Sequence, residues 1–314
     1  MIIQVDIFSG FLGAGKTMLI KKLLNEKVYE KNTVIIENEF GEVGIDGDIL
    51  KACNIEVKEI NSGCICCQVS GSFGEAVFDV INKYSPNNII IEPSGVAKLS
   101  EVLNILESIK FQHKIKVRNI FTLVDIKNYD MYINNFREFY ENQIRNANKV
   151  VLSRSQLVDD IRIKTTIASI KKLNAKAEII ERPWESLKGS DFLKDNNIDD
   201  KKEVSIIKSS LNKTFRREVI NNAKDVFESY PIDLIHFMST QEIQRKFEFI
   251  EKSEKFGKII RAKGVIEGTD GGYYQFDYVP NEFKSRKIKW ANRKVVSIIG
   301  SKLNRQELKQ LFDM

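Results

Sequence analysis

A glycine-rich motif near the start of the chain is the most informative part of the sequence for the fold: Gly10-Phe11-Leu12-Gly13-Ala14-Gly15-Lys16-Thr17. It satisfies the pattern G-x-x-x-x-G-K-[ST], whose backbone N–H groups can surround the oxygens of a phosphate. Residues 2–8 before it are typical of a buried strand, and residues 18–24 after it have the apolar spacing of a helix. Because the motif lies between an expected strand and an expected helix, it favours a phosphate-binding loop over a chance glycine-rich turn.

Each position of this loop has an expected contact with a bound nucleotide. The glycines allow the backbone to curl around the phosphates, and the following helix adds the positive end of its dipole. Lys16 would reach the β- and γ-phosphates, and the Thr17 hydroxyl would bind Mg²⁺. The residues expected to contact the nucleotide here are Gly10, Gly13, Ala14, Gly15, Lys16, Thr17 and Met18.

Short apolar runs alternate with helix-like stretches in the first part of the chain. The expected strands cover residues 2–8, 33–36, 55–60, 88–91, 117–124, 149–152 and 177–180. This alternation predicts an α/β fold, a P-loop NTPase domain with a mainly parallel sheet covered by helices on both faces. We expect this domain to cover residues 1–185.

The rest of the chain has a different pattern. Residues 186–202 are mostly polar and have no apolar period, which is typical of a linker. Residues 203–314 predict a smaller α+β domain. Its expected elements are a helix over 240–256, strands over 259–266, 273–279 and 295–299, a hairpin turn over 268–272, and a terminal helix capped by Asn304.

The composition excludes several classes of protein. The chain has 314 residues, of which 42% are hydrophobic and 29% charged, so a disordered or fibrous protein is excluded. No apolar run approaches the roughly 18 residues of a membrane-spanning helix, and the N-terminus lacks the basic region of a secretory signal. We therefore expect a cytoplasmic protein with no membrane partner.

Positive charge is concentrated in the C-terminal part of the chain. Residues 201–314 carry 23 basic and 15 acidic side chains, against 26 and 28 in residues 1–200. The basic stretch 284–294, which includes Trp290, is not accompanied by a nucleic-acid-binding module, so we expect no nucleic acid as partner. A solvated pair of strands, or a face for an acidic protein partner, is expected instead.

A second motif, Glu92-Pro93-Ser94-Gly95, follows a run of isoleucines. Ligands of open α/β sheets bind at the carboxyl ends of the strands. The Glu92 carboxylate there can contribute to the shell of Mg²⁺, and the Gly95 N–H can contact the γ-phosphate. A solvated glutamate that merely ends the strand is the alternative, which the upstream phosphate loop makes weaker.

Three of the four cysteines lie within the stretch Gly63-Cys64-Ile65-Cys66-Cys67. Three thiolates can converge on a divalent metal such as Zn²⁺ or Co²⁺ and leave a coordination position open, which suits transient holding. Buried structural cysteines and a redox pair are the alternatives. The separate Cys53 is expected to pack in the core.

The stretch Glu37-Asn38-Glu39-Phe40-Gly41-Glu42-Val43-Gly44-Ile45-Asp46 carries four carboxylates. A solvated loop is one interpretation. The other is a nucleotide-dependent switch whose carboxylates meet Mg²⁺, the attacking water or a cargo metal. Fewer than 20 residues separate this stretch from the first clustered cysteine, which motivates the hypothesis that nucleotide gates the metal site.

In this order, the segments GFLGAGKT, ENEFGEVGID, GCICC and IIIEPSG resemble the CobW-type family of metallochaperone nucleotidases. Its members are P-loop GTPases related to the nickel-insertion proteins of urease and hydrogenase. The segments Arg261-Ala262-Lys263-Gly264 and Ile298-Ile299-Gly300 resemble the smaller C-terminal domain of that family. The resemblance implies a GTP-hydrolysing metallochaperone that delivers a transition metal to a client metalloprotein or a corrinoid protein.

The resemblance also implies roles for individual residues. The implied catalytic residues are Lys16, Glu37 and Glu92. The implied metal ligands are Cys64, Cys66, Cys67, Thr17, Glu37 and Glu42, with Thr17 on Mg²⁺ and the cysteines on Zn²⁺ or Co²⁺. The only two histidines, His113 and His236, are isolated and are expected on the surface or in the core, so metal binding must rest on thiolates and carboxylates.

The sequence departs from the family at the element that reads guanine. An N-K-x-D element usually follows the strand expected here at 149–152, and its Asp accepts two hydrogen bonds from the base. The corresponding stretch is Ser153-Arg154-Ser155-Gln156, and Gln156 lacks the charge that makes such bonds strong. GTP remains the expected nucleotide, with Ser153 and Gln156 near the base, while ATP stays open.

Two other functions remain open from the sequence. A P-loop phosphotransferase or ATPase with structural cysteines would transfer or release phosphate without a role for the cysteines in turnover. A non-hydrolysing activator of a cobalt or corrinoid protein would bind nucleotide without turnover. A homodimer is left open as well.

Overall fold

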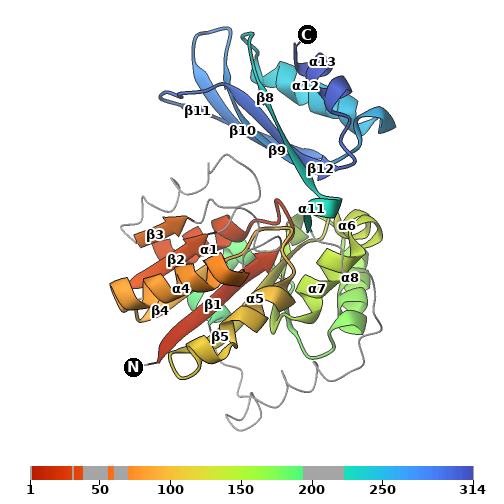
Figure 1. Cartoon of the computed structure of the whole chain (residues 1–314). Helices are drawn as coiled ribbons and strands as arrows, with labels where there is room; N and C mark the ends of the chain where they lie inside the picture. The colour runs from red at the N-terminus through yellow and green to blue at the C-terminus, as the bar shows by residue number, and fades with distance from the viewer. Residues whose placement is uncertain (1, 30–31, 38–55, 60–69, 194–222, 314) are drawn as a thin grey trace.

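The computed structural model describes residues 2–29, 32–37, 56–59, 70–193 and 223–313. Within these ranges the chain forms two sheets, each with its own hydrophobic core, stacked one above the other in Figure 1. The first is the predicted α/β domain and the second the predicted smaller α+β domain, so the fold class is confirmed. None of the described helices is long and apolar enough to cross a membrane.

The first sheet has seven strands in the order β3-β2-β4-β1-β5-β6-β7, and all neighbouring pairs are parallel. The strands are β1 (Ile3–Gly10), β2 (Thr33–Glu37), β3 (Glu56–Glu59), β4 (Asn88–Glu92), β5 (Ile115–Asp125), β6 (Lys149–Ser153) and β7 (Glu178–Ile180). All seven expected strands are present. The central strand β1 lies between β4 and β5, where the strand order reverses and ligands of such sheets bind.

Helices cover both faces of this sheet because its strands are apolar on both sides. They are α1 (Lys16–Asn25), α4 (Ser70–Tyr84), α5 (Leu99–Leu106), α6 (Tyr129–Asn135), α7 (Arg137–Arg145) and α8 (Asp160–Leu173), with short turns η1 (Ile109–Phe111) and η2 (Ser155–Leu157). On β4, Ile89 and Ile91 pack with α4 and α5, whereas Ile90 packs on the opposite side with α1. This alternation is the signature of a strand buried on both faces.

A short segment after β7 completes the core beside α1. It contains the turn η3 (Trp184–Ser186) and the helix α9 (Gly189–Phe192). Leu187 and Phe192 are 8% and 0% exposed and pack in the same core as α1. Lys149 Nζ of β6 donates to the Phe192 carbonyl at 2.6 Å. The first residues of the segment expected as a linker therefore pack with the first domain, because their apolar side chains cover α1.

The second sheet is antiparallel, in the order β11-β10-β9-β12-β8. Its strands are β8 (Glu228–Asp233), β9 (Lys258–Glu267), β10 (Tyr273–Val279), β11 (Glu282–Ile288) and β12 (Val295–Ser301), accompanied by α11 (Ala223–Val226), α12 (Thr240–Glu251), η4 (Glu254–Phe256) and α13 (Arg305–Asp313). The predicted helix, the β9–β10 hairpin, the last strand and the terminal helix are confirmed. The edge strands β8 and β11 were not predicted individually.

The second domain lies over the edge of the first sheet at which the strands end (Figure 1). Phe227, which follows α11, packs on Phe11 of the phosphate loop and on Phe139 of α7, with ring centroids 5.9 and 5.0 Å apart. The amide of Asn128 donates to the Pro280 carbonyl at 3.4 Å, between β10 and β11. The C-terminal domain therefore contacts the part of the first domain that carries the expected site.

Candidate functional site

The phosphate loop joins β1 to α1, and its backbone requires glycine. Gly10, Gly13 and Gly15 have φ values of 139°, 72° and 101°, a region that residues with a Cβ atom rarely adopt. At Gly10, a Cβ atom would also lie 2.5 Å from the Leu123 carbonyl oxygen of β5. The loop therefore has the tight curvature that lets consecutive N–H groups face an anion.

The helix α1 begins at Lys16, directly after the loop. Its first N–H groups and the positive end of its dipole therefore lie at the loop, where phosphate would bind. Lys16 and Ala14 are buried, whereas the Met18 side chain is 55% exposed. Met18 would thus contribute its backbone N–H and not its side chain.

The side chain of Phe11 anchors the loop in the protein. Its ring packs against Tyr132, Phe136 and Tyr140, with centroids 4.7, 5.4 and 5.6 Å apart. Burial, with the nearby charge of Asp125 as a second cause, raises the pKa of Tyr132 and of Tyr140 far above the ordinary value, so both phenols stay neutral. The loop therefore rests on a rigid aromatic cluster.

Thr17, Glu92 and Glu37 come together beside the phosphate loop. The Thr17 hydroxyl donates to Glu92 Oε1 at 2.9 Å. Glu37 ends β2 directly opposite Glu92, which ends β4, so both side chains leave the same face of the sheet, and both are buried. A hydroxyl and two carboxylates are oxygen donors of the kind that Mg²⁺ prefers, so this donor set fits the ion that accompanies a nucleotide.

The second predicted motif also lies against the phosphate loop. A Cβ atom at Gly95 would be 2.6 Å from the Leu12 backbone nitrogen, so only glycine allows this approach. The Gln143 amide donates to the carbonyls of Gly95 and Ala97, at 3.0 Å each, and fixes the segment after β4. Gln143 was not singled out in the sequence because its partners are more than 40 positions away.

The segment at the end of β6 that is expected to contact the base, residues 153–156, lies only partly at the phosphate loop. Ser153 is buried, and its Oγ would be 3.7 Å from a Cβ atom at Gly15. Trp184 lies at a similar distance from the same point, 3.9 Å. Gln156 is exposed, one position beyond the buried Ser155. The structure thus brings Ser153 and Trp184 to the loop, and Trp184 was not predicted.

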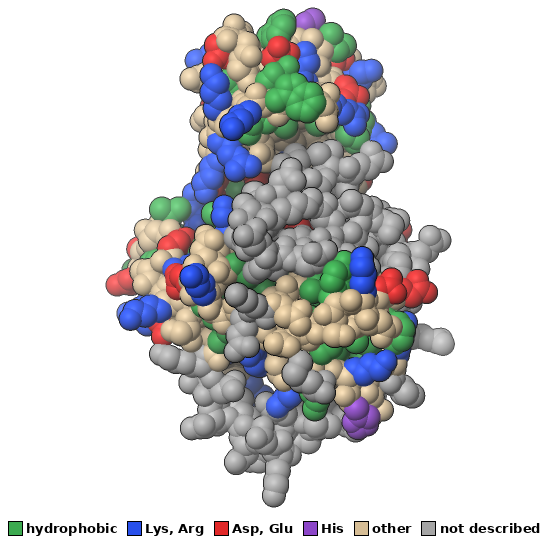
Figure 2. Space-filling model, turned by 90° about the vertical axis from the view of Figure 1, so that its left-hand side faces the viewer, with side chains coloured by type: hydrophobic (Ala, Val, Ile, Leu, Met, Phe, Trp, Pro, Cys, Tyr) green, Lys and Arg blue, Asp and Glu red, His purple; other side chains and the backbone are tan. Residues whose placement is uncertain are grey.

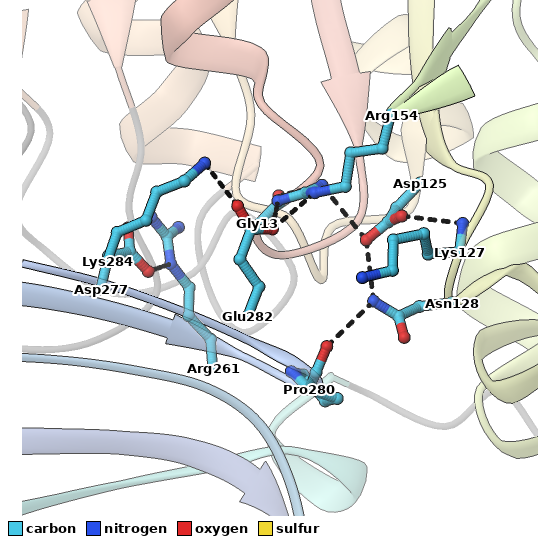
Figure 3. A network of polar contacts seen from close by, with 10 residues as sticks. All are labelled: Gly13, Asp125, Lys127, Asn128, Arg154, Arg261, Asp277, Pro280, Glu282 and Lys284. Carbon is cyan, nitrogen blue, oxygen red and sulfur yellow. Dashed lines mark hydrogen bonds and ion pairs between the residues drawn. The ribbon is translucent and has the colours of Figure 1, made fainter. Parts of the chain in front are cut away.

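Arg154 has a role that the sequence did not reveal. Its Nη1 and Nη2 donate to the Gly13 carbonyl at 3.1 and 3.2 Å, and Nη1 lies 3.2 Å from Asp125 Oδ2 (Figure 3). Its Nε donates to Glu282 Oε2 of β11 at 2.6 Å. One side chain therefore joins the phosphate loop, the end of β5 and the C-terminal domain.

Several predicted residues lie outside the described part of the chain. They are Glu42, Cys53, Cys64, Cys66 and Cys67, together with the acidic stretch from residue 38 onward. Within the described ranges, no group of three or more His, Cys, Asp or Glu side chains is arranged to hold a metal ion. His113 and His236, which were not expected to be ligands, are both exposed. The predicted cysteine site therefore stays a prediction.

Comparison with known proteins agrees with the motifs. A family described as CobW/HypB/UreG, nucleotide-binding domain, matches residues 4–181. The zinc chaperone YjiA of Escherichia coli K12 is 28% identical over 187 residues, which cover 56% of this chain and 56% of YjiA. The zinc chaperone CobW of a Sinorhizobium species is 30% identical over 185 residues, which cover 50% of this chain and 52% of that protein. The chain thus spans about half the length of these curated relatives.

A longer match exists to the zinc-regulated GTPase metalloprotein activator 1 of Schizosaccharomyces pombe. It is 23% identical over 320 residues, which cover 90% of this chain and 76% of that protein. The crystal structure of the Zn(II)-bound YjiA GTPase from E. coli covers 99% of this chain and 98% of its own, at 18% identity and a TM-score of 0.44. Because the family match spans more than half of the residues, the chain belongs to the CobW/HypB/UreG nucleotide-binding family.

Proposed function

We propose that this protein is a GTP-hydrolysing metallochaperone that binds Zn²⁺ or Co²⁺ and delivers it to a client metalloprotein or a corrinoid protein. The observation that carries the proposal is the Thr17 hydroxyl bonded to Glu92 beside the phosphate loop, with Glu37 on the neighbouring strand. Family membership and the zinc chaperones among the relatives support the metal half of the proposal and favour Zn²⁺ as the cargo.

The nucleotide would bind with its phosphates in the loop of residues 10–17. Lys16 would bind the β- and γ-phosphates, and Thr17 and Glu92 would hold Mg²⁺ on the side of the γ-phosphate. When bound, Mg²⁺ neutralises charge on the transferred phosphoryl group. Glu37, buried beside Glu92, would orient the attacking water, and the Gly95 N–H would contact the γ-phosphate.

The cargo metal would bind to the thiolates of Cys64, Cys66 and Cys67, with Glu37 and Glu42 as switch ligands. Glu37 is the last residue of β2 and the first of the acidic stretch, so it belongs to both proposed sites. A nucleotide that changes the position of this carboxylate would change the affinity of the metal site. Hydrolysis would then weaken the metal site and release the cargo.

This gating is tested by titrating Co²⁺ and following thiolate–metal absorption with and without Mg²⁺–GTP. We expect tighter Co²⁺ binding with a non-hydrolysable GTP analogue than with GDP. Cys66→Ala should abolish the thiolate band, whereas Cys53→Ala, the matched control, should retain it. Equal Co²⁺ affinity in all nucleotide states would contradict the gating mechanism.

We also propose that the basic side of the C-terminal domain binds an acidic client. β11 is an edge strand on which Lys284, Arg286 and Lys287 are exposed, and Trp290 beyond it is 65% exposed. Figure 2 shows Lys and Arg side chains on this domain beside exposed apolar groups. Binding of a candidate client should weaken with salt, as an electrostatic contact does.

Turnover distinguishes this function from the two alternatives. Release of inorganic phosphate from GTP supports the proposal. A phosphorylated small-molecule product that is unaffected by Cys66→Ala would instead indicate a phosphotransferase. Nucleotide binding without hydrolysis, even with metal and client present, would indicate a non-hydrolysing activator.

A further inference from the structure

We propose that Glu282 of the C-terminal domain is a positioning residue for the nucleotide site, which it completes by holding Arg154 against the phosphate loop. The inference rests on the proposed nucleotide binding. It implies that the phosphate loop has its binding conformation only while the C-terminal domain is docked on it.

Arg154 contacts both Glu282 and the phosphate loop through its guanidinium. Its guanidinium forms a fork to one oxygen of Glu282, with Nε and Nη2 both at 2.6 Å, while its other edge bonds the Gly13 carbonyl (Figure 3). Such charge-assisted, two-pronged bonds fix the plane of a guanidinium. Because the Arg154 side chain is only 14% exposed, water competes little for these bonds.

Asp125 holds Arg154 by a single, longer contact. Its side chain lies 3.2 Å from Nη1, but its oxygens also accept from the Lys127 N–H at 3.1 Å and from the Asn128 amide at 2.9 Å. Glu282 binds the opposite side of the guanidinium. The two carboxylates therefore hold it between them, one from each domain.

The Glu282 carboxylate is ionised at neutral pH. Burial opposes its ionisation, but the hydrogen bond from Lys284 and the charge of Arg154 outweigh burial, so the pKa of Glu282 lies below its ordinary value. Lys284 contacts the other oxygen of the same carboxylate. Lys284, on the same strand β11, therefore helps to orient the Glu282 carboxylate toward Arg154.

The turn that precedes Glu282 is fixed to both domains. Asn281 has a φ of 65°, and with Pro280 it links β10 to β11 in two residues. Glu251 Oε1 of α12 accepts from the Tyr278 hydroxyl at 2.8 Å and from the Asn281 N–H at 2.6 Å. Asn128 of the first domain holds the Pro280 carbonyl. The turn therefore behaves as a rigid support for Glu282.

Shape complementarity at Gly13 supports the same conclusion. A Cβ atom at Gly13 would lie 2.2 Å from Val279 Cγ1, so the last residue of β10 touches the phosphate loop itself. The carbonyl of the same glycine accepts from Arg154. A movement of this loop on nucleotide binding would therefore reach the C-terminal domain through both contacts, and docking would in turn favour nucleotide binding by linkage.

The test measures binding of fluorescent GTP and ATP analogues with Mg²⁺ to the full chain. We expect Glu282→Gln to weaken nucleotide binding about three- to tenfold, because the Gln amide keeps an acceptor oxygen for Arg154 but loses the charge that strengthens the bond. Glu267→Gln is the matched control, because Glu267 pairs with Lys294 at 3.1 Å in the same sheet and is equally exposed, at 21%. Arg154→Ala should weaken binding at least as much, and the double variant no further.

A second readout separates positioning from general stability. Mg²⁺–GTP should slow amide hydrogen exchange in residues 278–283 of the wild-type chain and have less effect in Glu282→Gln. This measurement on the wild-type chain tests whether nucleotide binding affects the turn beside Glu282, and it can be made even if the variants do not fold. Unchanged exchange, or wild-type affinity in a folded Glu282→Gln, would overturn the inference alone. A wild-type chain that binds neither nucleotide would overturn the proposed function together with it.

Discussion

Thr17 belongs to the phosphate loop, and its hydroxyl donates to the carboxylate of Glu92. It therefore connects the phosphate loop to the carboxylates of the candidate nucleotide site. Thr17→Ala should lower the Mg²⁺ dependence of nucleotide binding and reduce hydrolysis by about tenfold or more, as loss of a metal-site partner does. Phosphate release measured over a range of Mg²⁺ concentrations checks this. Thr165→Ala, which removes an exposed hydroxyl bonded only within α8, should behave like wild type.

A substitution at Gln156 tests which base the nucleotide site prefers. A carboxylate at this position could accept two hydrogen bonds from guanine and would repel no part of it, whereas adenine offers no matching pair. Gln156→Asp should therefore raise the preference for GTP over ATP by about tenfold. The ratio of the two dissociation constants measures this effect. Because Gln156 is exposed, the melting temperature should not change. An unchanged ratio would place the base elsewhere.

At the scale of residues, the sequence revealed the groups that lie in local motifs. Thr17, Glu92 and Gly95 were predicted because each follows a recognisable strand, and the structure places all three at the loop. Arg154 was not, because its partner Glu282 is 128 positions away and no local pattern links them. Long-range contacts of this kind depend on how two domains dock, which motif spacing does not encode.

At the scale of elements, the two strands that were missed are the two edges of the antiparallel sheet. Edge strands face water, so β11 carries charged residues in place of an apolar alternation. β8 contains Pro231, which ordinarily argues against a strand but is tolerated at an edge. The signal for β11 was Pro280-Asn281, a turn dipeptide directly after a predicted strand. The central strands were predicted because burial on both faces makes them continuously apolar.

Within the parallel sheet, Asp6 lies where the register between β1 and β5 shifts. The register shifts at Val5/Asp6, and the buried Asp6 carboxylate accepts from the Asn119 N–H at 3.1 Å, the Tyr29 hydroxyl at 2.9 Å and Arg118 Nη2 at 2.5 Å. Asp6→Ala should lower the free energy of unfolding by about 2–3 kcal/mol, because it removes a buried carboxylate and leaves the buried Tyr29 hydroxyl and Asn119 N–H without this acceptor, whereas Arg118 can still reach water. Urea denaturation measures this loss.

The milder variant Tyr29→Phe serves as the comparison. It removes one hydroxyl from the same carboxylate and should cost only about 1 kcal/mol. Neither change touches the phosphate loop, so the nucleotide affinity of the folded protein should remain that of wild type. A loss of affinity in folded Asp6→Ala would show that the register shift also shapes the site.

At the scale of the whole molecule, docking of the two domains should depend on pH. The pKa of Glu282 in the folded protein lies below the ordinary value of 4.5, so its contribution to stability is complete above pH 4.5 and is lost as the pH falls through the folded-state pKa. The difference in unfolding free energy between wild type and Glu282→Gln should therefore be largest near neutral pH and shrink in acid. Denaturation curves at pH 7 and at about pH 3.5 measure it. A difference that stays constant would mean that the Glu282 charge does not contribute.

The segment that carries Leu187 and Phe192 determines where the protein can be divided. A fragment that ends at residue 185 would leave the apolar side of α1 uncovered, at a cost of about 3–5 kcal/mol for the missing phenylalanine alone. We expect such a fragment to unfold at a lower urea concentration than one that ends at residue 193, because only the longer fragment keeps this cover, while both lack Phe227, which packs on Phe11 in the full chain. Proteolysis of the native chain should likewise spare the peptide bonds of residues 184–192, because cleavage requires backbone that can leave the core.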